Sequence, residues 1–185
     1  MNGNKEKNSS KTTVISAVAL VIVLLLVVIL VENMWTVGRE KAVEKGCTQL
    51  LQIIGEDGNA IEDILGDDGV YGTNELIYGD IKLMNCPPSD LVIGLFENRE
   101  IYYRWSSIEK IAVINQTYDL MVEKITELLG EDKIIYTGNE DSVSWQYDWN
   151  NIVTVYKEPY SEPGDNSFVV SEYQITFTHQ CLDIG

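Results

Sequence analysis

Basic side chains, histidines and cysteines are scarce in this sequence. Its 185 residues include 13 Lys and Arg against 29 Asp and Glu, a net charge of −16, with one histidine and three cysteines. An acidic surface repels phosphate backbones and anionic headgroups, so the composition argues against nucleic-acid binding and favours a cationic partner. One histidine and no CxxC pair are too few for an ordinary zinc site. We therefore expect no metal and no cofactor.

A set of catalytic residues is also lacking. Nucleophilic catalysis would require His179 beside a Ser or Cys, and Cys181 stands two positions away, on the same face if both lie on one strand. A histidine at such a position is usually solvated, so we do not expect a catalytic role for it. The sequence has no Gly-rich phosphate-binding loop, and its acidic turns lack the spacing of a calcium loop. We predict that the protein is not an enzyme.

The three cysteines cannot all pair with one another within one chain. Cys47 falls in a predicted helix, Cys86 in a loop before two prolines, and Cys181 near the end of the sequence. Two interpretations stay open: buried thiols that act as small apolar side chains, or a single Cys47–Cys86 bridge.

One long apolar run, residues 14–31, stands out from the rest of the chain. It contains no charge, Pro or Gly, and as a helix it would extend about 27 Å, close to the ~30 Å hydrocarbon core of a bilayer. A buried core helix is one alternative. A cleavable signal peptide is another, but its apolar region is shorter, and residues 32–38 (ENMWTVG) lack a small-residue cleavage site. We predict an uncleaved anchor at residues 14–34 that contacts the lipid bilayer.

The orientation of this anchor depends on the basic residues beside it. Three precede the run and three follow within about 15 residues, so a simple positive-inside count is a tie. Lys11 nearly adjoins the run, whereas Arg39 stands eight residues beyond it. We therefore expect a single-pass protein of the cell membrane, with residues 1–13 as a short cytoplasmic head and the larger C-terminal part outside. Trp35 would be an interfacial aromatic anchor.

The part of the chain after the run is strongly acidic and patterned like a folded protein. Residues 1–13 hold three of the lysines and one glutamate, which leaves 10 basic and 28 acidic side chains after the run, a net charge of −18. The acids are dispersed among aromatic and β-branched residues and not gathered into a tail, so we expect a folded domain. At about 150 residues it can bury one core, or two small joined ones.

Periodicity and turn signals divide this part into helices and strands. The first half reads as two helices and three strands, at residues 39–54, 60–65, 75–84, 91–97 and 100–105, with Asn98-Arg99 as a hairpin turn. The second half reads as one helix and three strands, at residues 118–129, 143–149, 152–157 and 168–178, with a turn at Asn150-Asn151 and an acidic loop at residues 158–166.

The two halves repeat the same order of elements. The segment ILGDD at residues 64–68 has the counterpart LLGED at residues 128–132, and residues 95–97 correspond to 155–157. Chance is the alternative explanation for matches this short, but the repeated order of elements is harder to dismiss. We predict an α+β fold in which a single transmembrane helix precedes two tandem helix-plus-antiparallel-sheet repeats, at residues 36–105 and 106–185.

This pattern resembles the β-lactamase-inhibitor proteins and the SmpA/OmlA outer-membrane assembly lipoproteins. The second half carries the resemblance in ELLG at residues 127–130, SWQY at 144–147 and IVTVY at 152–156, and the first half in DILG at 63–66 and FENREI at 96–101. The chain departs from these families because it has no lipid-bearing Cys and its cysteines are not placed in pairs. The resemblance implies a non-enzymatic domain whose curved sheet presents aromatic and charged side chains to another protein.

Aromatic residues supply the candidate binding surface. Trp145, Tyr147 and Trp149 occupy alternating positions that share one face of a strand, and Tyr102 and Trp105 lie in a corresponding strand of the first half. Such rings either form the core under a helix or, when exposed, provide hot spots for a protein partner or stacking platforms for sugars.

Two functions are consistent with these features. The first is a membrane-anchored extracytoplasmic protein-binding module that scaffolds or inhibits an envelope protein. The alternative is a sensor domain at the cell envelope for a small ligand or glycan, with residues 158–166 as a mobile lid.

Overall fold

A computed structural model describes residues 5–138, 141–160 and 172–182, with side chains from Leu20 onward. The chain divides into two units, Met1–Arg39 and Glu40–Gly185, and each is described by itself. One helix, α1 (Lys5–Gln52), begins in the first unit and ends in the second. It starts within residues 1–13, for which the sequence predicted only a short head before the anchor.

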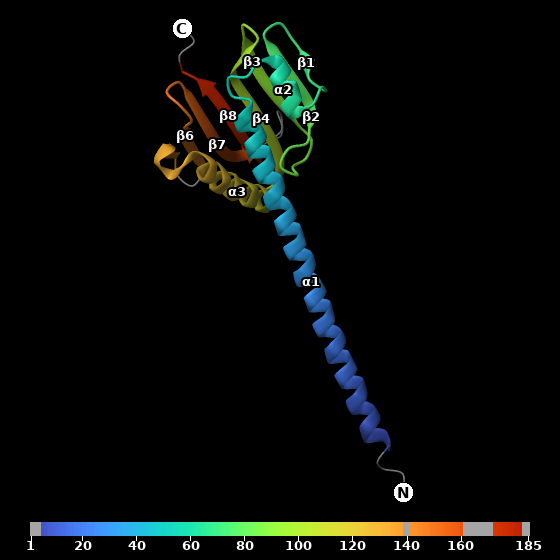
Figure 1. Cartoon of the computed structure of the whole chain (residues 1–185). Helices are drawn as coiled ribbons and strands as arrows, with labels where there is room; N and C mark the ends of the chain where they lie inside the picture. The colour runs from blue at the N-terminus through green and yellow to red at the C-terminus, as the bar shows by residue number, and fades with distance from the viewer. Residues whose placement is uncertain (1–4, 139–140, 161–171, 183–185) are drawn as a thin grey trace. The chain divides into compact units, whose positions relative to one another are not determined.

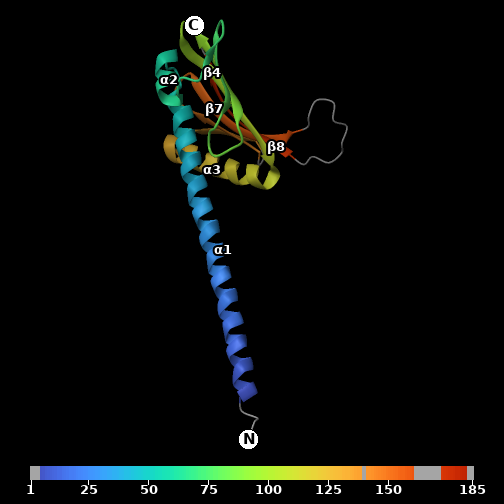
Figure 2. The same ribbon diagram turned by 90° about the vertical axis from the view of Figure 1, so that its right-hand side faces the viewer.

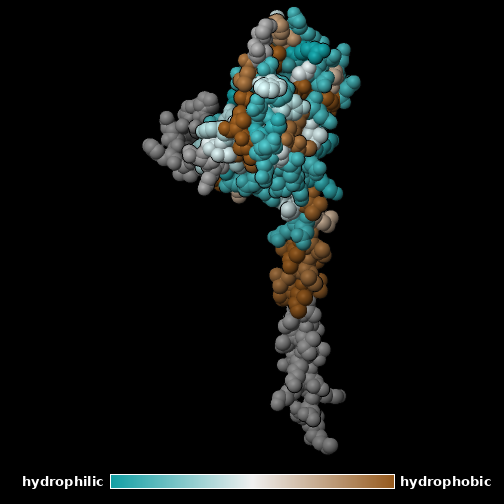
Figure 3. All heavy atoms as spheres, turned by 60° about the vertical axis from the view of Figure 1, so that its left-hand side comes forward, coloured by the Kyte–Doolittle hydropathy of each residue, from teal (hydrophilic) through white to brown (hydrophobic). Residues whose placement is uncertain are grey.

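The first unit presents an apolar helical surface. The side chains of residues 20–31 are all exposed, and the described part of α1, Leu20–Gln52, contains a stretch long and apolar enough to cross a membrane. Figure 3 shows it as an unbroken hydrophobic band. The side chains of residues 14–19, where the predicted anchor begins, lie outside the described part. Beyond the apolar residues, the Arg39 guanidinium lies 5.1 Å from the centre of the Trp35 ring.

The second unit is built on one antiparallel sheet of eight strands (Figure 1). The strands lie in the order β1-β2-β3-β4-β8-β7-β6-β5, so β4 and β8 occupy the middle. Their bounds are β1 (Val70–Tyr71), β2 (Glu75–Ile81), β3 (Ser89–Phe96), β4 (Arg99–Lys110), β5 (Ile134–Gly138), β6 (Ser142–Gln146), β7 (Asn151–Tyr160) and β8 (Glu172–Cys181).

The register of the strands determines which residues form the core. Alternate residues of a strand point to opposite faces, so paired positions form rows across the sheet. Two buried rows lie on the same face: Leu76, Ile93, Tyr103, His179, Val153 and Trp145 in one, and Tyr78, Leu91, Trp105, Phe177, Val155 and Val143 in the other. Most members are apolar, and burying one large apolar side chain contributes about 1.5–3 kcal/mol.

Three helices cover these rows (Figures 1 and 2): the C-terminal part of α1, α2 (Gly58–Leu65) and α3 (Ile111–Leu129). Each buries residues at helical spacing, for example Val43, Cys47 and Leu50 in α1. Between α1 and α3, the Lys124 ammonium pairs with the Glu40 carboxylate at 3.2 Å and also contacts two acids of its own helix.

The predicted C-terminal ends of the second and third helices, Leu65 and Leu129, are confirmed, whereas α1 ends at Gln52, two residues before the predicted end. The Asp57 side chain caps α2 by accepting hydrogen bonds from the backbone N–H groups of Asn59 and Ala60. Gly66 and Gly130 end α2 and α3 with φ of 105° and 103°, values that side chains with a Cβ rarely adopt. A short 3-10 turn, Glu131–Lys133, then leads into β5.

Several element boundaries differ from the sequence prediction. The first hairpin turns at Glu97 and Asn98, both at positive φ, and not at Asn98-Arg99. Strand β4 continues to Lys110, beyond its predicted end at residue 105. Helix α3 follows at once and begins seven residues before the predicted helix. The predicted acidic loop at 158–166 begins inside β7, and its remainder, with the first residues of the predicted strand 168–178, lies outside the described residues.

The structure holds Cys47 and Cys86 as buried thiols. The Cys86 thiol donates to the carbonyl oxygen of Met84 at a sulfur–oxygen distance of 3.8 Å. Burial, and secondarily the neighbouring Cys86, raises the pKa of Cys47 to about 12, so its reactive thiolate form is strongly disfavoured at neutral pH.

Candidate functional site

Two of the five predicted aromatic site residues belong to the core. Trp105 and Trp145 lie in the two buried rows and have no exposed area. The indole N–H of Trp145 donates to the Thr126 hydroxyl oxygen of α3 at 3.1 Å, which gives a buried polar atom its partner. Neither ring therefore contributes to a surface.

Tyr102 lies on the opposite face of the sheet and is 39 % exposed. Its ring lies across Gly94 of β3, where a side chain would collide with it. Its hydroxyl donates to the Glu75 carboxylate at 3.2 Å. Strands β8 and β7 separate β4 from β6, so Tyr102 is not brought together with the aromatic residues of the second half.

The two remaining predicted residues, Tyr147 and Trp149, lie in the connection between β6 and β7. Strand β6 ends at Gln146, so the expected alternation of Trp145, Tyr147 and Trp149 on one face stops there. Tyr147 is half-buried against the core, whereas Trp149 is 92 % exposed at the tip of the turn. An indole this exposed is available for binding at little conformational cost, because its backbone is already fixed in a turn.

Asp148 fixes that turn. Its carboxylate accepts hydrogen bonds from the backbone N–H of Asn150 at 2.9 Å, the backbone N–H of Asn151 at 3.0 Å and the side-chain amide of Asn151 at 2.7 Å. Burial opposes ionisation of Asp148, but these hydrogen bonds and the charge of His179 together lower its pKa from the usual value. Residues 148–151 thus form an Asx-type turn with Trp149 at its apex.

A buried polar chain supports the turn from beneath. The Asn151 amide oxygen lies 2.9 Å from Nε2 of His179, and Nδ1 of His179 lies 2.6 Å from the Glu100 carboxylate. The second oxygen of Glu100 accepts the backbone N–H of Gly55 at 2.8 Å. Because the Asn151 NH₂ is directed to Asp148, its oxygen faces the imidazole, and Nε2 must donate.

His179 is therefore structural, and the expectation that it is solvated is wrong. It is 2 % exposed, because β8 lies in the middle of the sheet and His179 occupies a core row between Tyr103 and Val153. Both ring nitrogens contact acceptor-bearing groups, Glu100 and Asn151. No ring nitrogen is left to act on a substrate.

A surface hollow of about 420 Å³ lies beside Trp149. It is lined by two aromatic rings, two polar side chains and one cation: Tyr147, Trp149, Gln146, Asp148 and Lys133. Rings stack on apolar or planar groups, and the flanking amide, carboxylate and ammonium can fix their orientation. This set, the β6–β7 site, can bind a ligand or a partner side chain.

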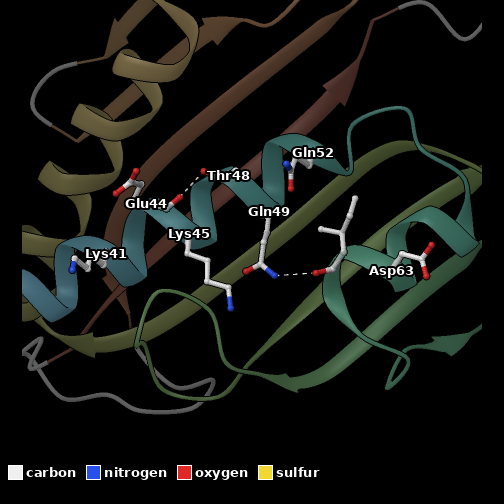
Figure 4. A pocket seen from close by; sticks show the side chains of 8 residues that line it. Lys41, Glu44, Lys45, Thr48, Gln49, Gln52 and Asp63 are labelled. Carbon is white, nitrogen blue, oxygen red and sulfur yellow. Dashed lines mark hydrogen bonds between the residues drawn. The ribbon is translucent and has the colours of Figure 1, made fainter.

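A second hollow of about 530 Å³ lies between α1 and α2 (Figure 4). Its lining is polar, with charges of both signs and no aromatic ring: Lys41, Glu44, Lys45, Thr48, Gln49, Gln52, Asp63 and Ile64. Two polar groups are already engaged, since the Gln49 amide donates to the carbonyl of Ile64 and the Thr48 hydroxyl to that of Glu44. We regard it as the weaker candidate.

Sequence reasoning did not find Lys133, Gln146 or Asp148. The pattern Asp-x-Asn-Asn at residues 148–151 is an Asx-turn signal that could have placed Trp149 at an apex. Nothing local identifies Lys133, because it reaches the site through pairing of β5 with β6.

Comparisons with known proteins do not identify a relative. No family model, no curated protein and no solved structure matches this chain. The resemblance to β-lactamase-inhibitor and SmpA/OmlA proteins therefore stays a prediction. Among the described residues, no group of three or more His, Cys, Asp or Glu side chains could hold a metal ion.

Proposed function

We propose that this chain is a membrane-anchored, non-enzymatic module that binds a protein of the cell envelope through the β6–β7 site. The observation that carries the proposal is Trp149, a tryptophan 92 % exposed on a hydrogen-bonded turn beside a hollow of about 420 Å³. Exposed indoles on preorganised backbone are typical hot spots of protein interfaces.

The anchor and its orientation form part of the proposal. The exposed apolar surface of residues 20–31 is suited to lipid, and the positions of Lys11 and Arg39 favour a cytoplasmic N-terminus. An acidic domain on the outer side would be held near the membrane within reach of cationic surfaces of envelope proteins.

The tandem-repeat organisation also belongs here. Each half runs from helices into four antiparallel strands, β1–β4 and then β5–β8, and the last strands of the two halves, β4 and β8, pair with each other. This arrangement supports two repeats joined into one sheet, with the β6–β7 site at the second hairpin of the second repeat.

Photo-crosslinking in membranes tests the binding proposal. A photoreactive phenylalanine analogue in place of Trp149 should yield one dominant protein adduct, because this side chain would lie in the interface. The same analogue in place of Asp119, exposed on α3, is the control and should yield none. The proposal fails if position 149 gives no adduct, or the same adducts as position 119.

A glycan or small ligand is the second candidate, favoured by the pairing of Tyr147 and Trp149 with hydrogen-bonding groups in one hollow. In a thermal-shift screen, an envelope glycan that binds this hollow should then raise the melting temperature of the unsubstituted chain but not that of Trp149→Ala. The lid predicted for this function, residues 158–166, falls mostly outside the described residues. An absence of stabilisation by any glycan would remove this candidate.

A further inference from the structure

The outer edge of β5 is an unprotected sheet edge. Strand β5 ends the sheet at the side opposite β1, and within the described part of the chain no strand pairs with its outer side. An edge strand presents unpaired backbone N–H and C=O groups that can pair with another extended chain.

The usual protections of an edge strand are mostly missing from β5. Its five residues, IIYTG, include no charge and no Pro, and Ile135 and Tyr136 are 49 % and 58 % exposed. One register irregularity occurs between Ile134 and Tyr136, after which Tyr136–Gly138 pair regularly with β6. The ring of Tyr136 covers Gly138, where a side chain would collide with it.

The opposite edge differs. Strand β1 has only two residues and follows the acidic turn Asp67-Asp68. Its neighbour β2 carries Asp80 near its end, and this residue is exposed and has a positive φ. Shortness and inserted charge are common devices against edge pairing. The asymmetry identifies β5 as the edge open to a partner strand.

Charge selects the kind of partner. Exposed acids flank β5 on both sides, Glu131 and Asp132 before it and Asp141 after it, within a domain of net charge −18; Lys133 directly precedes the strand, and Asp141 pairs with Lys157 at 3.5 Å. Antiparallel pairing of β5 with a second copy would bring Glu131 and Asp132 of one copy toward Asp141 of the other. Parallel pairing would place each of these acids beside the same acid of the other copy. Both arrangements are repulsive, whereas an extended segment with basic ends is attracted.

We propose that β5 accepts an extended, basic segment of the partner protein as an added strand. This inference rests on the proposed function and extends its interface, since Lys133 of the β6–β7 site directly precedes β5. Backbone hydrogen bonds would provide affinity, and the exposed side chains of Ile135 and Tyr136 would contact neighbouring side chains of the added strand.

Hydrogen exchange on the full chain in detergent micelles tests the proposal. The probe is the synthetic peptide Lys-Thr-Val-Thr-Val-Thr-Lys, and its control carries Glu in place of both Lys. The basic peptide should slow amide exchange at residues 134–138, with an effect that weakens at high salt, and the acidic peptide should not. Equal protection by both peptides, or by neither, overturns the inference. Protection that instead rises with protein concentration alone also overturns it, because it would mean pairing between copies.

One substitution at an exposed position of each edge strand, β5 and β1, tests which edge binds the peptide. Tyr136→Lys should weaken binding of the basic peptide on the order of tenfold, because it removes a cross-strand contact and adds like charge. Val70→Lys, at a position 68 % exposed on β1, should leave binding unchanged. Equal effects would contradict the β5 assignment. If Trp149 forms its crosslink while β5 amides stay unprotected, the proposed function stands and only this inference fails.

Discussion

At the scale of single residues, two tryptophans four positions apart have opposite roles. Trp145 completes a core row and donates its indole N–H to Thr126, whereas Trp149 projects into solvent. The difference arises within one turn, because Asp148 redirects the chain between them.

Alanine substitutions should separate these roles. Trp145→Ala should lower the free energy of unfolding by about 3–5 kcal/mol through loss of buried surface and creation of a cavity. Trp149→Ala should change it by less than about 0.5 kcal/mol, so any loss of partner binding would report contact and not folding. Urea denaturation followed by circular dichroism measures both, and a large destabilisation by Trp149→Ala would contradict the exposed position.

The Asp148 turn should loosen in acid. Its folded pKa lies below the ordinary aspartate value near 3.9, so its stabilisation is complete above that pH and is lost as the pH falls through the lower folded value. The side-chain amide signals of Asn151 in NMR spectra should shift across that range. In Asp148→Asn the same titration step should be absent, and its persistence would assign the step to another group.

At the scale of elements, close approach of α1 to the β2–β3 connection explains a glycine in the middle of a helix. A Cβ at Gly46 would lie 2.5 Å from Cγ and 3.3 Å from the backbone nitrogen of Met84. Gly38, in the same helix, has no atom within 4 Å of such a Cβ.

Alanine should therefore act oppositely at the two glycines. Gly46→Ala should destabilise the domain by about 1–3 kcal/mol through overpacking, despite the higher helix propensity of alanine. Gly38→Ala should be neutral or should stabilise α1 by up to about 1 kcal/mol. Thermal unfolding of the two variants compares them directly. Equal stabilisation would mean that Met84 moves aside without cost.

The elements that sequence predicts well are those with local signals. The apolar stripe through Val43, Cys47 and Leu50 correctly identified the buried face at the C-terminal part of α1, and Gly130 marks the correctly predicted end of α3 at Leu129. Strands β1 and β5 were missed because two and five residues carry no clear alternation, and both depend on pairing with a neighbour. Burial of His179 was missed for a related reason: only sheet order places β8 between β4 and β7.

At the scale of the whole molecule, α1 links an exposed apolar surface to an acidic domain. If residues 14–34 span the bilayer, the full chain should stay with membranes after alkaline carbonate extraction. Substituting Leu24→Asp and Val27→Asp together should release it, because each charge near the centre of a span costs about 2.5–3.5 kcal/mol.

Matched substitutions outside the predicted span, Val37→Asp with Gly38→Asp, should leave the chain in the membrane fraction. The mass of the extracted protein distinguishes the remaining alternative. A chain shortened by its apolar N-terminus would identify a cleaved signal peptide and contradict the anchor.

The central place of β8 has a consequence for the order in which the domain assembles. Glu100 and His179, which meet near the ends of β4 and β8, are 79 positions apart in the chain. During synthesis, strands β1–β4 emerge long before the strand that completes them, and the twelve-residue edge of β4 stays open in the meantime. Long-range strand pairing is slow, and open edges invite aggregation. The edge of β4 is therefore open to pairing with other chains until β8 is available to cover it.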